Sequence, residues 1–350
     1  MTAAPSLTGT TADWVALGRR RRDGRRRTVA WGLGALLLGL FALTLMLGQS
    51  FIPPGDVLRV MLGQDVPVAS FTVGTLRLPR ATLSVVAGLS FGMGGAAFQT
   101  MLRNPLASPD IIGISFGASA AAVIGIVFFG LSGGAVSTFA IAAGLGVALL
   151  IYGLSFKGGG AGARLILIGI GMASMLESVI AYALQKASSW SHAEAMRWLA
   201  GSVNGATWGE ILPAALALVL FGGVLLTRAR DLETLRLGDD AAAALGVRVA
   251  WTRITVLVTA VGMIAFATAA AGPIAFVAFL SGPIAARITG PGRSLLIPAA
   301  LTGAVLVLLA DYVGQFALPS RYPVGVVTGA LGAPYLVWLI ARSNSGGGAS

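Results

Sequence analysis

The stretch Leu76–Ala120 constrains the fold more than any other part of the sequence. Arg77 and Arg80 stand at its head, and no charged residue follows until Arg103. An uncharged apolar run of about twenty residues is long enough to cross a bilayer as a helix. The stretch therefore predicts a membrane crossing with charges only at its two ends.

Three glycines within this crossing indicate how it packs. Gly88, Gly92 and Gly95 follow a spacing of i, i+4 and i+7, which places them on one helical face. Small residues on one face let a neighbouring backbone approach closely. We expect this face to pack against protein.

The turn after the crossing reads RNPLASPD. Asn104 and Pro105 should end the helix, because proline disrupts helical hydrogen bonding. Ser108 suits the N-cap of a second helix, Pro109 its first position, and Asp110 its positive end. The sequence thus predicts that a second crossing begins close to Ser108.

The same residues resemble a known family. The string RLPR, then Q-x-x-x-R-N-P-L-A-x-P and G-x-S-x-G-A, resembles the FecCD family of ABC-importer permeases, which move ferric siderophores, haem or vitamin B12. The residues that carry the resemblance are Arg77 to Arg80, Gln99, Arg103 to Ala107, Pro109, Gly113, Ser115, Gly117 and Ala118. The resemblance covers nearly the whole chain after Thr28 and implies an all-α integral membrane protein with the type II ABC importer permease fold.

Composition supports a membrane protein. Of the 350 residues 56% are hydrophobic and 11% are charged, a balance that soluble domains of this size do not have. The absence of cysteine excludes disulfides and thiolate metal sites, and the single histidine, His192, excludes histidine-rich metal or haem ligation. We therefore expect no metal site. The formal charge of +11 is explained better by membrane topology than by nucleic-acid binding.

The chain divides into a polar, arginine-rich tail over residues 1–28, a transmembrane permease domain over 29–342 and a flexible tail over 343–350. A secretory signal peptide is a poor alternative for the first apolar run, because no convincing cleavage site follows it. About ten crossings are predicted. The apolar runs lie at about 29–48, 81–102, 111–130, 137–155, 165–185, 211–227, 254–271, 274–288, 295–317 and 323–341.

The basic residues predict the orientation. Ten crossings place both termini on one side, and that side then carries eighteen of the 24 lysines and arginines, against six on the other. By the positive-inside rule the N- and C-termini are cytoplasmic and the protein lies in the cytoplasmic membrane. The two longer outside loops contain a possible short helix from Asp56 and three tryptophans typical of interfacial anchors. These are Trp190, Trp198 and Trp208.

A polar segment between the sixth and seventh crossings is a candidate docking site. Apolar residues from Leu235 to Leu245 recur near helical spacing, and Gly238 and Gly246 punctuate a short helix. Such a helix suits a partner protein or the bilayer surface. Its likeness to the family signature L-G-x-x-x-A-x-x-L-G favours docking of the ATPase subunit. The candidate coupling residues are Leu237, Gly238, Asp239, Asp240, Ala244, Leu245 and Gly246.

The chain has no ATPase motif of its own. Its only lysines, Lys157 and Lys186, do not lie in a phosphate-binding G-x-x-x-x-G-K-[ST]. We therefore expect no enzymatic activity and no cofactor on this chain, with ATP and Mg²⁺ held by a pair of separate ATPase subunits.

Arginines on the predicted outside face are candidates for docking an extracytoplasmic substrate-binding protein. In the family, arginines of the RLPR string meet glutamates of that protein, which implies this role for Arg77 and Arg80. A later family arginine aligns with Gln315, and Arg321 is a substitute for it. The alternative for all three arginines is that they are interfacial anchors.

Polar residues inside the crossings are candidates for the translocation pathway. An intramembrane carboxylate suggests function, and Glu177 either lines the pathway or bonds a neighbouring helix. Asp311 pairs in spacing with Gln315 and, because the family carries an Ala-Asp there, is interpreted as structural, as is Asn104. The pathway candidates are Gln99, Met93, Glu177 and Gln315.

The stretch Gly272–Arg287 has Ile284 where many relatives have histidine. This variation resembles one member of the paired permeases of catecholate-siderophore systems, so a heterodimer with a second permease subunit is favoured over a homodimer. The predicted function is import of a ferric siderophore. Vitamin B12 or haem import is the alternative, followed by an ion-coupled secondary transporter that uses Glu177 and Asp311, and by a membrane scaffold.

Overall fold

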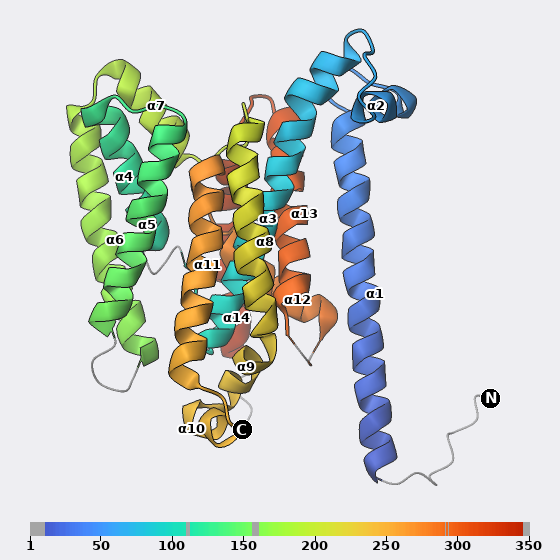
Figure 1. Cartoon of the computed structure of the whole chain (residues 1–350), viewed down its shortest axis with the longest axis vertical. Helices are drawn as coiled ribbons and strands as arrows, with labels where there is room; N and C mark the ends of the chain where they lie inside the picture. The colour runs from blue at the N-terminus through green and yellow to red at the C-terminus, as the bar shows by residue number, and fades with distance from the viewer. Residues whose placement is uncertain (1–10, 110–112, 156–160, 291, 293, 346–350) are drawn as a thin grey trace.

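The computed structural model describes residues 11–109, 113–155, 161–290, 292 and 294–345, and this part of the chain is helical with connecting turns (Figure 1). The long helices are α1 (Thr11–Met46), α3 (Leu78–Met101), α4 (Ile114–Phe129), α5 (Gly134–Ser155), α6 (Ala161–Lys186), α8 (Trp208–Thr227), α11 (Val249–Ala271), α12 (Val277–Thr289), α13 (Leu296–Phe316) and α14 (Val324–Ser345). Shorter helices are α2 (Pro54–Met61), the π-helical η1 (Ser70–Arg77), α7 (Ser189–Leu199), α9 (Ala229–Thr234), the 3₁₀ helix η2 (Leu235–Leu237) and α10 (Asp239–Ala244).

Each of the ten predicted apolar runs corresponds to one long helix. Within the described residues seven helices are long and apolar enough to cross a membrane, and α4, α12 and α14 supply shorter apolar stretches at 115–129, 277–289 and 324–338. The helix that corresponds to the eighth run starts later than predicted. The helix α12 starts at Val277 and not at 274, because Gly272 (φ 69°) and Phe276 (φ 64°) adopt left-handed conformations that end one helix before the next begins.

The helix α3 forms the centre of the bundle, and 83% of its most apolar window is buried. A Cβ on Gly88 would lie 2.5 Å from Ala304 Cα, and one on Gly92 would meet the Ala299 carbonyl, both in α13. A Cβ on Gly95 would meet the Ala278 carbonyl in α12. The expected packing of this glycine face against protein is therefore confirmed.

The turn after α3 differs from the sequence prediction. The helix α4 begins at Ile114, and its N-cap is Gly113 with φ of 89°. The predicted N-cap at Ser108 is thus wrong, because Ser108 and Pro109 are buried in an extended turn that precedes the helix. The predicted role of Asp110 lies outside the described residues.

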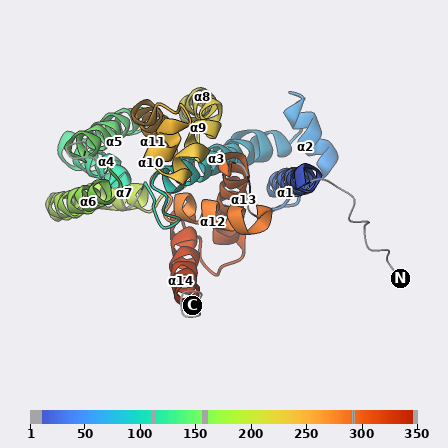
Figure 2. The same cartoon turned by 90° about the horizontal axis from the view of Figure 1, so that it is seen from below.

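The helices run roughly parallel to one axis, so the molecule has two ends (Figure 1). We call them the α7 end, which also carries α2, and the α10 end, which also carries α9. Figure 2 shows α4, α5 and α6 grouped on one side of the central helices and α1 on the opposite side. The helix α1 packs mainly on α13, and only 6% of its most apolar window is buried.

The connections at the α7 end are partly helical. The short helix predicted from Asp56 is confirmed as α2, whereas α7 was not predicted. Of the three tryptophans, Trp190 is 75% and Trp208 51% exposed, while Trp198 packs against the core formed by α4, α5 and α6. Trp198 is therefore a packing residue in this chain.

Candidate functional site

The segment α9–η2–α10 has one buried and one exposed apolar face. Leu232 and Leu235 are each 1% exposed, and Ala242 is fully buried in the same core as the end of α3. Leu237 and Leu245 are 66% and 67% exposed. The first face anchors the segment to the bundle, and the second is an apolar surface without a cover in the described chain.

Glycines shape this segment. Gly238, with φ of 106°, is the N-cap of α10, and Gly246, with φ of 86°, follows its end. The predicted short helix between two glycines is thus confirmed. The apolar residues from Leu235 to Leu245 do not share one helical face, as their spacing predicted. Leu235 is buried, whereas Leu237, at the end of η2, is exposed.

Asp239 joins the segment to two other elements. Its Oδ1 accepts a hydrogen bond of 2.7 Å from Arg253 Nη2 of α11. The same oxygen lies 3.8 Å from Nη2 of Arg103, which directly follows α3. The neighbouring Asp240 is exposed.

At the α7 end, Arg80 is held inside the chain. Its Nε and Nη2 donate to the two carboxylate oxygens of Asp311 at 2.8 and 2.7 Å, and its Nη1 donates to Asn204 at 2.8 Å. Gln315 donates to Asp311 at 3.2 Å, which fits the predicted spacing of this pair. Because Asp311 is 3% exposed, the group forms a buried bidentate ion pair between α3 and α13.

Arg77 is also engaged within the chain. Its guanidinium donates to the carbonyls of Leu45 and Met46 at 2.9 and 3.0 Å, and to that of Ser50 at 2.7 Å. The last carbonyls of a helix lack partners within it. Arg77 therefore caps α1 and fixes its end to η1.

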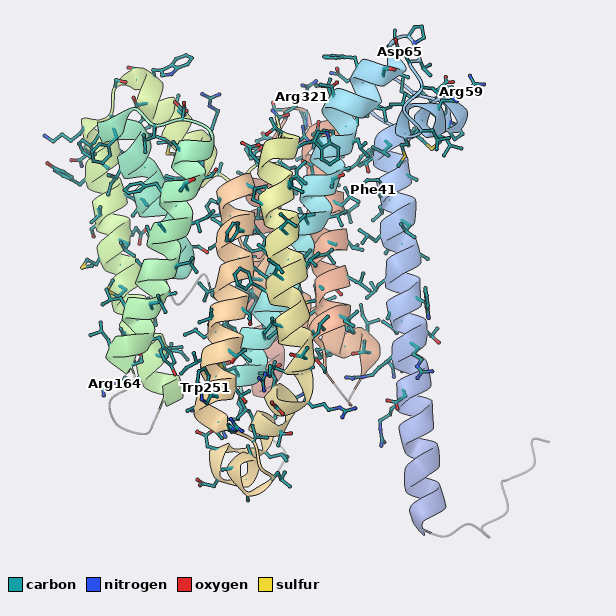
Figure 3. The ribbon with its side chains drawn as sticks, in the orientation of Figure 1. Phe41, Arg59, Asp65, Arg164, Trp251 and Arg321 are labelled. Carbon is teal, nitrogen blue, oxygen red and sulfur yellow. The ribbon has the colours of Figure 1, made fainter. Side chains whose placement is uncertain are left out.

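A polar cavity of about 470 Å³ opens beside this ion pair. Its lining comes from α3, α4, α5, α7, α8, α11 and α13 and from the loops before α8 and α14. The charged and amide groups among them are Arg80, Glu194, Arg197, Glu210, Gln315 and Arg321. Arg321 is exposed at the α7 end (Figure 3). Sequence reasoning missed Arg197 and both glutamates, since no pattern in the chain connects α7 or the start of α8 with this cavity.

Two of the predicted pathway residues lie within the helix packing. Met93 is 7% exposed, and its sulfur lies 3.5 Å from the position of a Cβ on Gly222 of α8. Gln99 is 8% exposed and donates to the Phe279 carbonyl at 2.9 Å. Within α12 that carbonyl would bond the backbone N–H of residue 283, which is proline and has none. Gln99 thus supplies the missing donor.

Glu177 and Asn104 occupy different environments. Glu177 is exposed on α6, although Gly169 and Ala173 of the same helix approach Gly113. The small residues therefore pack the start of the helix and leave Glu177 on an uncovered face of this chain. Asn104 accepts at 2.9 Å from the Leu106 N–H and so stabilises the turn after α3.

A bundle with seven helices long and apolar enough to cross a membrane, among the described residues, is the architecture of a multi-pass membrane protein. Residues 36–342 match the FecCD transport family, and the chain belongs to that family. The predicted family is thereby confirmed, and residues 1–35 and 343–350 lie outside the match.

Individual relatives agree with this assignment. The chain is 39% identical over 300 residues to the ferric enterobactin transport system permease protein FepG of Escherichia coli K12, covering 85% of this chain and 90% of that protein. It is 35% identical to the probable siderophore transport system permease protein YfhA of Bacillus subtilis 168, covering 90% and 96%. It is 33% identical to the vitamin B12 import system permease protein BtuC of Salmonella paratyphi A, covering 92% and 98%.

Solved structures extend the agreement to the fold. The chain superposes on a metal-chelate type ABC transporter in an inward-facing conformation with a TM-score of 0.81 and 27% identity, covering 90% of this chain and 99% of that chain. The chain is therefore a transport component of the ABC class.

Proposed function

We propose that the chain is the permease subunit of an ATP-driven importer that moves a ferric siderophore across the cytoplasmic membrane. The observation that carries the mechanism is the uncovered apolar face of Leu237 and Leu245 at a polar end of the bundle. Exposed apolar side chains surrounded by polar groups are typical of protein interaction sites. Relatives named for ferric enterobactin and for siderophores support the substrate class.

In this proposal the α10 end is cytoplasmic and α9–η2–α10 docks an ATPase subunit. The orientation rests on the positive-inside rule, since eighteen of the 24 basic residues belong to the same side as the arginine-rich start of α1. ATP and Mg²⁺ bind the two ATPase subunits, whose closure would switch the access of the permease.

The α7 end then faces the substrate-binding protein. Arg321 is exposed and lines the polar cavity, so it is placed to meet an acidic side chain directly. Arg77 and Arg80 form hydrogen bonds within the chain and would stabilise the surface of the α7 end on which the binding protein docks. Charge pairs at such rims mainly guide encounter, so docking should weaken with salt.

A second permease subunit completes the pore, and a heterodimer is favoured over a homodimer. Two relatives, FepG and FepD of Escherichia coli K12, are both named as permease proteins of the ferric enterobactin transport system. The exposed face of α6 that carries Glu177 is our candidate for the surface that meets the second subunit along the pathway.

An ion-gradient mechanism fits the geometry less well. It would need Asp311 to load and release an ion, whereas this carboxylate is 3% exposed and already neutralised by Arg80. A vitamin B12 permease is the second candidate for the substrate, because BtuC is 33% identical to the chain.

Uptake in a strain that lacks this chain tests the proposal. Radiolabelled iron on a panel of siderophores should lose ATP-dependent entry for one ferric siderophore, while labelled cobalamin and haem should enter normally. Loss of cobalamin entry alone would mean that the substrate is vitamin B12 and not a ferric siderophore. Uptake that follows an ion gradient would overturn the ATP-driven mechanism.

The docking surface has its own test. Leu245→Arg places a charge on the apolar face and should abolish co-purification of the ATPase without affecting insertion. Leu58→Arg on α2, where the leucine is 59% exposed at the opposite end, is the matched control for an added arginine. Unchanged co-purification in Leu245→Arg would exclude this face as the docking site.

A further inference from the structure

The proposed docking segment needs a connection through which its movement reaches the bundle. Its apolar anchors Leu232, Leu235 and Ala242 lie in the core that also contains Phe98 and Met101 of α3. Apolar contacts of this kind hold the segment in place, but they do not fix the direction in which it would pull on a neighbouring helix. A directional contact requires a hydrogen-bonded or charged group between the segment and a helix.

Asp239 is that group in the described part of the chain. It is the first residue of α10, and its Oδ1 binds Arg253 in the first turns of α11 at 2.7 Å. The same oxygen lies 3.8 Å from Arg103 at the end of α3. One carboxylate thus joins the docking segment to two helices at once.

The backbone around this carboxylate is set for the contact. Arg103 has φ of 53°, a left-handed conformation that is unfavourable for a non-glycine residue. Its Nη1 lies 3.6 Å from the position of a Cβ on Gly238, the residue directly before Asp239. The turn after α3 is therefore folded so that its arginine reaches the start of α10.

The contact is also able to change. Asp239 is 35% exposed and Arg103 is 46% exposed, and ion pairs with such access to water are weak because water competes for both partners. A partner that binds the adjacent face of Leu245 could shift a contact of this strength. The apolar anchors would keep the segment folded while it moves.

We propose that Asp239 is the positioning residue that transmits the movement of a docked ATPase from α10 to α3 and α11. This inference rests on the proposed function, because it requires an ATPase on α9–η2–α10. It assigns Asp239 to force transmission, whereas Leu237 and Leu245 supply the affinity.

The test compares Asp239→Asn with Asp56→Asn in the complete transporter reconstituted in liposomes with its substrate-binding protein. Asp56 lies on α2 at the opposite end of the bundle, and its ion pair at 3.5 Å goes to Arg59 of the same helix. Its side chain is 32% exposed, close to the 35% of Asp239, so it is a matched control that loses a carboxylate outside the docking segment.

We expect Asp239→Asn to co-purify the ATPase normally and to lower substrate uptake per ATP hydrolysed roughly tenfold, a typical coupling effect. Asp56→Asn should leave this ratio unchanged, and Asp239→Glu should recover part of it. Arg103→Gln removes the same link from the α3 side and should also lower the ratio, which keeps the test open if Asp239→Asn does not insert.

Two results would overturn the inference. Equal uptake per ATP in Asp239→Asn and Asp56→Asn would show that the link transmits nothing, and loss of ATPase co-purification in Asp239→Asn would make Asp239 a docking residue. The proposed function is tested separately: it is contradicted if Leu245→Arg still binds the ATPase.

Discussion

The two ends of α3 are attached in opposite ways. At the α7 end Arg80 forms a bidentate pair with Asp311, whose side chain is 3% exposed. At the α10 end Arg103 shares one oxygen of Asp239 with Arg253, at 3.8 and 2.7 Å, and Asp239 is 35% exposed. Both ends use arginine and aspartate, but they differ in burial and in the number of bonds.

This difference shows which end of the helix can move. A buried ion pair cannot be opened without leaving a charge away from water, which is strongly unfavourable. A solvated pair loses little when water replaces one partner. We conclude that the α7 end of α3 is a fixed attachment and that the α10 end is adjustable.

Removal of Asp311 should have the largest effect on this comparison. Asp311→Ala leaves Arg80, 17% exposed, without its counterion and should lower the free energy of unfolding by about 3–5 kcal/mol. Asp239→Ala at the other end should cost less, about 1–2 kcal/mol, because Asp239 is 35% exposed, although the change leaves Arg253, 17% exposed, without this hydrogen bond. Denaturant unfolding of the detergent-solubilised protein measures both.

A double variant is the control for the buried pair. Arg80→Met with Asp311→Leu removes both charges and should recover much of the loss, because a buried pair replaced by apolar side chains is often neutral. Equal losses in Asp311→Ala and Asp239→Ala would contradict the distinction between the two ends.

Tight packing in the middle of α3 is needed for a movement at one end to reach the other. A Cβ on Gly92 would meet the Ala299 carbonyl, so Gly92→Ala forces α3 and α13 apart and should cost about 1–3 kcal/mol. Gly223→Ala in α8 is the control, because nothing lies within 4 Å of its Cβ position and alanine favours helices. The same denaturant measurement applies, and a neutral Gly92→Ala would mean that α3 is loosely packed.

Gln99 near the α10 end of α3 should give a smaller and conditional effect. Gln99→Met removes the donor to the Phe279 carbonyl and should cost about 1–2 kcal/mol, because a buried acceptor is left without a partner. In a Pro283→Ala background the α12 backbone regains its own N–H, so the same change should cost clearly less. A double-mutant cycle of unfolding free energies measures this coupling, and additive losses would argue against it.

Several features of this fold follow from local sequence alone. The apolar runs and glycine spacing predicted the ten long helices and the packed face of α3, since both depend on residues close in sequence. Gly238 and Gly246 likewise predicted α10, because left-handed glycines end helices.

The partners of the charged residues could not be predicted in this way. Arg80 meets Asp311 across 231 positions, and Arg253 meets Asp239 only because η2 turns the chain before α10. The hydrogen bond of Gln99 could not be predicted either, because its partner is the Phe279 carbonyl. That carbonyl is free to accept only because Pro283 has no N–H to offer it. Long-range pairing depends on how whole helices pack, which no short pattern records.

Salt should produce the smallest effect and separate the two ends most directly. At about 1 M salt the screening length falls to about 3 Å, which weakens solvated ion pairs far more than buried ones. Amide exchange in residues 229–246 should therefore speed up by roughly twofold to fivefold, corresponding to less than about 1 kcal/mol. Exchange at the start of α3, beside Arg80 and Asp311, should not change. In Asp239→Asn the salt effect on residues 229–246 should become smaller, because the Arg228–Asp231 and Arg236–Glu233 pairs of this segment are still there to be screened. An equal response to salt at both ends would mean that burial does not distinguish the two attachments, and the adjustable end would then have to be found elsewhere in the bundle.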